Sequence, residues 1–184
     1  DTVLSDSYYG MYTLTNYILQ KGHRDIMFVG AIHKNTCSGR PILLAFVRAM
    51  MEAGILVTQN HILVDRDENG HYALSASQLS HIPTAFICSR DSSAYQLLKI
   101  LKEKNIRVPE DVSITGFDDY ILSSLCTPKI TTYSIDVAKL TDSCIWLLLD
   151  RIAQPDRPLR HIVISGKIME RDSVRTLLTN PESR

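Results

Sequence analysis

The sequence has no long hydrophobic run and no excess charge of either sign. Its densest apolar patch, at 144–149, is far shorter than the roughly 20 residues that a membrane-spanning helix needs. Lys and Arg total 20 and so do Asp and Glu, so no overall field draws the chain toward DNA or an acidic membrane. The first ten residues are polar and lack the basic region of a secretory signal peptide.

Motifs that would indicate a metal, a disulfide framework or catalysis are also missing. The four cysteines form no C-x-x-C pair, and the six histidines show no metal-ligand spacing. No nucleophile elbow, H-E-x-x-H motif, P-loop or dinucleotide fingerprint is present. The acidic pairs at 118–119 and at 65 and 67 are too close in sequence to face each other across a substrate. We therefore expect free thiols in a reducing cytoplasm, no metal, no cofactor and a binding protein rather than an enzyme.

Short apolar runs alternate with amphipathic stretches along the chain, which has 184 residues of which 45% are hydrophobic. Strands that read as continuous apolar runs, each followed by a helix, are typical of a parallel sheet covered on both faces. The sequence thus predicts an α/β fold with a doubly wound parallel sheet. Strands are expected at 3–4, Ile26–Val29, 61–64, 84–88, 112–115, 130–133, 161–165 and 167–170, and helices at 9–20, 42–53, 72–79, 92–104 and 136–152.

Polar loops follow three of these strands, and an open α/β sheet binds its ligands at the carboxyl ends of its strands. The loop after Ile26–Val29 offers the hydroxyl of Thr36 and the guanidinium of Arg40. The next two loops offer Arg90 as a donor and Asp118 as an acceptor, and Tyr72 supplies an aromatic face. Paired donors and acceptors beside an aromatic ring suit a polyol.

Each of these residues also has a purely structural interpretation. Asp118 and its neighbour can cap a short helix that starts near residue 120, and Asp91 can cap the helix at 92–104. Arginines such as Arg40 and Arg90 are more often solvated surface residues than ligand contacts. Tyr72 can be a core residue on a helix face. Only their joint placement at strand ends favours a binding site.

Six segments of the chain resemble successive signatures of the lactose/galactose-repressor family of transcription regulators. They follow the family's order and cover nearly the whole chain. The segments are NYILQKGHRDIMFVG (16–30), AFVRAMMEAGI (45–55), PTAFICSRD (83–91), VPEDVSITGFDD (108–119), TPKITTY (127–133) and GKIMERDSV (166–174).

This resemblance implies the two-lobed fold of type I periplasmic binding proteins, with three chain crossings between the lobes. It assigns 1–20 and 134–158 to a remnant of the N-terminal lobe, 21–133 and 159–176 to a nearly complete C-terminal lobe, and 177–184 to a tail. Family members also carry an N-terminal helix-turn-helix headpiece and a much longer first lobe, which these residues do not include. The resemblance therefore implies DNA binding for a longer parent protein.

The resemblance also implies roles for single residues. Asp118 matches the family's acceptor for effector hydroxyls, Tyr72 the aromatic that stacks on the ligand, and Thr36 and Arg40 its contacts from the first loop. Arg40 stands two residues earlier than the family's arginine, so either an insertion follows it or this contact is lost. Arg90 stands where many sugar-binding members have asparagine, which favours an anionic effector such as a sugar acid or phosphate.

The function implied by the resemblance is effector sensing in a DNA-binding transcription regulator, a repressor in the first instance. The effector is expected to be a sugar, or a purine or another small metabolite, bound in the cleft between the lobes. The intact protein is expected to be a homodimer that binds operator DNA and no membrane. The alternative function is that of a periplasmic-type sugar-binding protein with the same fold.

Overall fold

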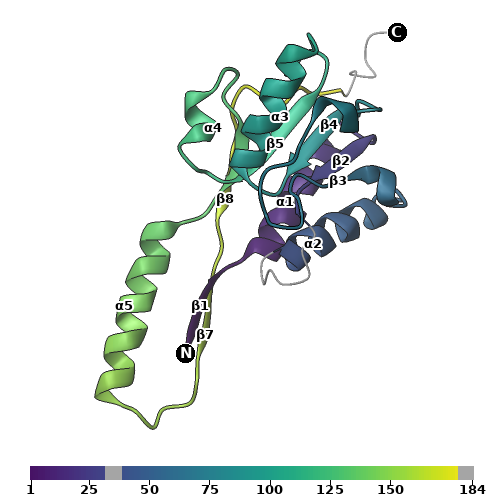
Figure 1. Ribbon diagram of the computed structural model, residues 1–184. Coiled ribbons are helices and arrows are strands. Elements are labelled where there is room, and N and C mark those ends of the chain that lie inside the picture. The colour runs from purple at the N-terminus through teal and green to yellow at the C-terminus, as the bar shows by residue number, and fades with distance from the viewer. Residues whose placement is uncertain (32–38, 178–184) are drawn as a thin grey trace.

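The computed structural model describes residues 1–31 and 39–177, which form eight strands, five α-helices and two 3₁₀ turns within those ranges (Figure 1). In chain order the elements are β1 (Thr2–Ser5), α1 (Ser7–Gln20), β2 (Ile26–Val29), α2 (Gly39–Glu52), η1 (Gln59–His61), β3 (Ile62–Leu63), η2 (Ala76–Gln78), β4 (Ala85–Cys88), α3 (Asp91–Glu103), β5 (Ser113–Asp118), α4 (Leu122–Leu125), β6 (Thr131–Ser134), α5 (Val137–Ala153), β7 (His161–Ile164) and β8 (Lys167–Met169).

Two sheets divide the structure into a body and an arm. The body contains a six-stranded sheet of order β3-β2-β4-β5-β6-β8, in which only β8 runs antiparallel to its neighbour, together with α1 to α4. The arm contains the parallel pair β1-β7 and the helix α5, which lies against both strands. Figure 1 shows the arm projecting away from the body, with three segments joining the two. The predicted α/β fold with a mainly parallel sheet is confirmed.

The alternating direction of strand side chains builds two cores, one on each face of the body's sheet. On β2, Ile26 and Phe28 point into a cluster with α1 and α2, whereas Met27 and Val29 point into a cluster with α3. All four side chains are at least nine-tenths buried. Because both faces are covered, the strand is apolar at every position, which is why its sequence shows no alternation.

The helices α1 and α3 end close to the predicted positions, but the predicted cap of α3 by Asp91 is wrong, because Arg90 stands at its N-cap and no side chain caps it. At α1, the carboxylate of Asp6 accepts a hydrogen bond from the backbone N–H of Tyr9 at 3.0 Å, and Gly22 follows the helix with a positive φ of 94°. At α3, Asn105 takes the left-handed conformation with φ 57° directly after the last turn. These caps satisfy backbone groups that the helix itself leaves unpaired.

The helix α1 packs in the body, although the sequence interpretation grouped 1–20 with the N-terminal lobe. Its residues Met11, Leu14 and Ile18 are fully buried in the same cluster as Phe28. Conversely, β7 pairs with β1 in the arm, although it falls inside the predicted C-terminal segment 159–176. The apolar stripe of an amphipathic helix predicts burial, but it does not tell which sheet the helix will cover.

The prediction of a helix at 72–79 is wrong. Tyr72 forms an antiparallel bridge with Arg66 after a turn at Gly70, whose φ is 83°. Only one 3₁₀ turn, Ala76–Gln78, follows, and the side chain of Gln78 accepts a hydrogen bond from the backbone of Ser75 at 2.8 Å. The local side-chain bonds of Ser75 and Gln78 thus compete with a longer helix.

Candidate functional site

The carboxyl ends of β2, β4 and β5 lie along one edge of the body's sheet, because these neighbouring strands are parallel. We call this edge the rim. Arg90 and Asp118 both lie on it, directly after β4 and at the end of β5. Thr36 lies outside the described residues. Arg40 falls in the first turn of α2, but its side chain also lies outside what the structure describes.

Asp118 presents an exposed carboxylate at the rim. Its backbone has a φ of 95°, a conformation that residues with a Cβ rarely adopt. Partial desolvation by the surrounding protein raises the pKa of Asp118, and the positive charge of Arg90 acts in the opposite direction. The two side chains therefore lie on the same rim, as an acceptor and a forked donor.

Arg90 occupies the N-cap position of α3, with an extended φ of −154° and an exposed side chain. Its guanidinium forms no ion pair within 4 Å with a carboxylate among the described residues. The partial positive charge of the helix N-terminus adds to that of the guanidinium at this position. This part of the rim can therefore donate hydrogen bonds to a ligand's oxygen atoms.

Tyr72 is half-exposed beside the start of α3, and its hydroxyl donates a hydrogen bond to the hydroxyl of Ser92. The guanidinium of Arg66 lies over its ring, 4.0 Å from the centroid, and also donates to the carbonyl of Gly70 at 2.9 Å. One face of the ring is thus covered by a cation. Sequence reasoning missed Arg66, although the same strand-end rule applied to β3 would have found it.

Beneath the rim lies a buried carboxylate, Asp91, which sequence reasoning interpreted as a helix cap. Its Oδ1 accepts the hydroxyl of Thr132 at 2.6 Å, and its Oδ2 accepts the backbone N–H of Tyr120 at 2.5 Å. Burial raises the pKa of Asp91 to about 7, these two hydrogen bonds lower it, and Asp118 and Asp119 raise it further. Asp91 therefore ties α3 to β6 and to the turn after β5.

A second buried carboxylate, Asp65, lies at the end of β3 and accepts a hydrogen bond from the hydroxyl of Ser93. Its other oxygen, Oδ1, has no hydrogen-bond partner within the described part of the chain. The buried thiol of Cys88 has a pKa raised well above its usual value, by burial first and then by the charges of Asp65 and Asp91. The raised pKa favours the protonated thiol, which is a weaker nucleophile than the thiolate.

Several signature residues prove to be structural. Asp119, with φ 55°, forms an ion pair with Arg171 at 2.6 Å. Ser173 accepts the backbone N–H of Thr131 at 2.8 Å and donates to the carbonyl of Ile114 at 2.6 Å. Through these contacts, the segment that follows β8 holds β5 and β6 in place. The acidic pair 118–119 is thus divided, with one carboxylate in an ion pair and the other exposed.

His23 is also structural, because both nitrogens of its fully buried ring lie 3.0 Å from an oxygen of the body, the hydroxyl of Thr84 and the carbonyl of Arg175. Desolvation lowers its pKa, which favours the neutral ring. Over 1–31 and 39–177 no group of three or more potential ligands could hold a metal ion. No helix in these ranges is long and apolar enough to cross a membrane.

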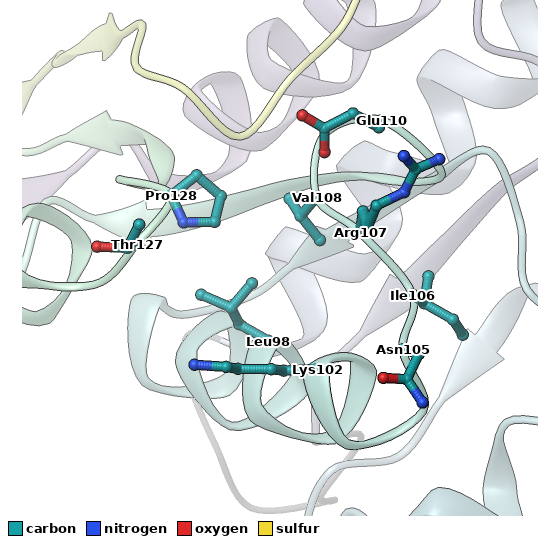
Figure 2. A pocket seen from close by; sticks show the side chains of 9 residues that line it. All are labelled: Leu98, Lys102, Asn105, Ile106, Arg107, Val108, Glu110, Thr127 and Pro128. Carbon is teal, nitrogen blue, oxygen red and sulfur yellow. The ribbon is translucent and has the colours of Figure 1, made fainter.

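A pocket of about 490 Å³ lies at the other edge of the sheet, before β5 and β6 (Figure 2). Figure 2 shows Leu98 and Lys102 on one side of it, with Val108 and Pro128 across from them. Ligands of open α/β sheets bind at the carboxyl edge, so this pocket is distinct from the rim. Of the predicted site residues that the structure describes, Tyr72, Arg90 and Asp118, none lines this pocket.

A family model for the periplasmic binding protein-like domain matches residues 15–174. The chain belongs to this family, in its lactose/galactose-repressor (LacI/GalR) branch. The HTH-type transcriptional repressor PurR of Salmonella arizonae is 36% identical over 95% of the chain. Because the match covers 52% of that repressor, the chain spans about half the length of the curated relatives it matches.

Solved structures of LacI-family regulators share the fold. A regulator from Enterococcus faecium with bound ribose is 25% identical, with a TM-score of 0.83 over 97% of this chain and 66% of the other. A putative LacI-family regulator from Rhizobium etli is 28% identical, with a TM-score of 0.81 over 94% and 64%. The family assignment made from the six sequence segments is confirmed. The prediction that the chain is not an enzyme is also confirmed, because the matched relatives are transcriptional regulators.

Proposed function

We propose that this LacI-family chain is the effector-sensing part of a DNA-binding transcription regulator, a repressor, and that it binds a sugar or a related metabolite at the rim. The observation that carries the proposal is that the carboxylate of Asp118 and the guanidinium of Arg90 are both exposed at the carboxyl ends of neighbouring parallel strands. A polyol offers hydroxyl donors to the carboxylate and oxygen acceptors to the guanidinium. The ribose bound by the Enterococcus faecium relative supports this ligand class.

In the proposed arrangement the body is the C-terminal lobe and the arm belongs to the N-terminal lobe. We assign α5, within 134–158, and β1 to the N-terminal lobe, as the sequence predicts. We place α1 and β8 with the C-terminal lobe because they pack on, or pair with, its sheet. The effector then lies in the cleft between the lobes, with Thr36, Arg40, Tyr72, Arg90 and Asp118 contributed by the C-terminal lobe.

The proposed mechanism is a shift between two lobe arrangements rather than a chemical reaction. Three short segments join the body to the arm, after β1, after β6 and after β7. A ligand that contacts both lobes stabilises one arrangement by the difference between its affinities for the two. In an intact homodimer this change alters the relative orientation of two headpieces on a palindromic operator in the cytoplasm. The homodimer, the operator and the location are part of the proposal.

The test is a thermal-shift screen of the intact regulator against D-ribose, other sugars, sugar phosphates and nucleosides. Binding at a hundredfold excess over Kd stabilises the native state by about 2.7 kcal/mol. We expect Asp118→Asn to lose most of this shift, whereas Asp142→Asn, at an exposed carboxylate on α5, retains it. Retention of the full shift in Asp118→Asn would rule out the proposed contact.

A second comparison within the screen distinguishes neutral from anionic ligands. If Arg90 selects an anionic effector, sugar phosphates shift the intact regulator more than neutral sugars do, and Arg90→Ala abolishes that difference. An unchanged preference in Arg90→Ala would contradict this role. Effector-dependent release of operator DNA separates a repressor from the alternative, a periplasmic-type sugar-binding protein, because the latter binds its sugar without any effect on DNA.

A further inference from the structure

The first turn of α3 contacts three different segments of the body through three consecutive side chains. Ser92 accepts the hydroxyl of Tyr72, Ser93 donates to Asp65 at the end of β3, and Asp91 accepts from Thr132 and from the turn after β5. These segments carry the candidate ligand contacts on both sides of Arg90. The turn is therefore a junction on which the shape of the rim depends.

Asp91 is the member of this junction that acts on Asp118. The end of β5 and the turn that follows it hold two consecutive residues with positive φ, 95° at Asp118 and 55° at Asp119. Such conformations are unfavourable for residues with a Cβ, and they persist where surrounding contacts impose them. Asp119 is held by its ion pair with Arg171 at 2.6 Å. The residue after it, Tyr120, is held by its backbone N–H, which donates to Asp91.

The residues around Asp91 leave room for its carboxylate. A Cβ added to Gly116 of β5 would lie only 2.0 Å from Asp91 Oδ1, so the absence of a side chain at 116 leaves room for this oxygen. Asp91 is 1% exposed and Thr132 is fully buried. A carboxylate removed from water this far costs free energy unless hydrogen bonds to it compensate. Both of its hydrogen bonds lead away from α3, to β6 and to the turn after β5, and Arg90 rather than Asp91 stands at the N-cap of α3. The carboxylate therefore holds other segments in place and does not cap α3.

We propose that Asp91 is a positioning residue for the effector site, which holds Asp118 in its left-handed conformation by fixing the N–H of Tyr120 and the hydroxyl of Thr132. Asp91 does not touch the ligand. It sets the direction in which the Asp118 carboxylate points. This inference rests on the proposed function only for its effect on ligand affinity, since the effect on the turn itself follows from the geometry.

Three substitutions in the intact regulator separate positioning from general stability. Asp91→Ala removes both acceptors, whereas Asp91→Asn keeps the shape, retains an acceptor for the N–H of Tyr120 and lets its amide donate to Thr132. Ser93→Ala is the matched control, because it removes a buried hydrogen bond from the same helical turn, but one that leads to Asp65. Segment-resolved amide hydrogen exchange then compares residues 117–122 with residues 66–73.

We expect Asp91→Ala to speed exchange at 117–122 by about tenfold or more relative to 66–73, and Asp91→Asn to restore most of the protection. Ser93→Ala should leave 117–122 unchanged. Equal acceleration of both segments, or no acceleration in Asp91→Ala, would overturn the proposal. If Asp91→Ala does not fold, Thr132→Val removes one of the two bonds and should produce the same local effect at about threefold, and unchanged exchange would then overturn it.

The affinity measurement uses D-ribose as the probe, at a temperature well below the unfolding transition of every variant. Where the wild-type regulator binds ribose, Asp91→Ala should weaken binding by about tenfold or more, with Asp91→Asn and Ser93→Ala close to wild type. Unchanged ribose affinity in Asp91→Ala would overturn positioning of the effector contact. Where the wild-type regulator does not bind ribose, the sugar chosen for the proposed function is wrong, and the exchange experiment still decides the role of Asp91.

Discussion

The body and the arm differ in what holds them together. In the body, both faces of the sheet are covered by helices, and four phenylalanines are essentially inaccessible to solvent. In the arm, α5 buries only Leu147, whereas Trp146, Leu148 and Leu149 are each more than half exposed. Hydrophobic burial thus stabilises the body, while polar contacts make up most of what fixes the arm within residues 1–31 and 39–177.

The polar contacts of the arm lie around the loop that joins α5 to β7. Arg151 donates to both carboxylate oxygens of Asp1 at 2.8 and 2.9 Å and to backbone carbonyls of the loop after α5. Asp150 accepts from Arg157 and Arg160, and the guanidinium of Arg160 lies 5.0 Å from the ring centre of Trp146. The side chains of these ion pairs are 12–42% exposed, and ion pairs that solvent can reach contribute little stability each. We therefore expect the arm to open before the body does.

The largest expected effect comes from a matched pair of leucines. Leu97→Ala in α3 leaves a cavity in a fully buried cluster and should cost about 2–5 kcal/mol of unfolding free energy. Leu148→Ala in α5 removes a side chain that is 61% exposed and should change stability by less than about 0.5 kcal/mol. Denaturant unfolding of the 184-residue chain measures both, and equal losses would refute the contrast between the two regions.

An intermediate effect is expected at the junction between the two regions. A Cβ on Gly166, which lies between β7 and β8, would meet the backbone carbonyl of Ser134 at 1.9 Å. Backbone cannot move aside as a side chain can, so Gly166→Ala should cost about 1–3 kcal/mol and shift the arm. The control is Gly54→Ala, where φ is +75° but no atom lies within 4 Å of the added carbon.

Gly54→Ala should cost only about 1 kcal/mol, from the backbone conformation alone. Amide exchange in β1 and β7 adds a second measurement, because a displaced arm loses protection there. A Gly166→Ala variant with the stability of Gly54→Ala and unchanged exchange in the arm would show that the junction is looser than its geometry indicates.

A further contrast between the two regions is an opposite dependence of stability on pH. Burial raises the pKa of Asp91 in the body to about 7, so its contribution to stability is present below the unfolded pKa and is lost as pH rises toward 7. The guanidinium of Arg160, followed by that of Arg157, lowers the pKa of Asp150 in the arm. The contribution of Asp150 is present above its unfolded pKa and is lost as pH falls.

Lowering the pH from 7 to 4 should therefore favour the body through Asp91 and weaken the arm through Asp150. Unfolding of wild type and Asp91→Asn across this range isolates the first effect. The wild type should gain stability relative to Asp91→Asn as pH falls, and Asp150→Asn should flatten the acid-induced loss of protection in the arm. Parallel pH profiles for wild type and Asp91→Asn would contradict the assignment to Asp91.

The sequence predicts the body's architecture well because the strands, and their alternation with helices along the chain, follow from the local pattern of apolar residues. The strand Ile26–Val29 was predicted at its observed bounds, and Gly22 and Asn105 end their helices as expected. The partner of α1 could not be predicted, because an apolar stripe at helical spacing fits any apolar surface. The prediction of a helix at 72–79 is wrong because Tyr72 forms a β-bridge with Arg66, which the helical spacing of apolar residues does not reveal.

At the rim, the strand-end rule predicts the position of Arg90 and Asp118, but it does not distinguish exposed side chains from those that support the turn. The sequence favours a helix cap for Asp91 because an acid at the start of a helix commonly accepts hydrogen bonds from its free backbone N–H groups. Its actual partners lie 29 and 41 residues away in sequence. Asp118 and Asp119 look alike in sequence, and only Arg171, 52 residues further on, distinguishes the ion-paired acid from the exposed one.

The most direct test of the central claim is titration calorimetry of the intact regulator with the sugar that stabilises it most, comparing wild type, Asp118→Asn and Asp142→Asn. If the rim of the body is the effector site, Asp118→Asn weakens binding by about tenfold or more, since a charged hydrogen bond is lost, and Asp142→Asn on the arm binds like wild type. Equal affinity of all three proteins would place the effector elsewhere and contradict the account.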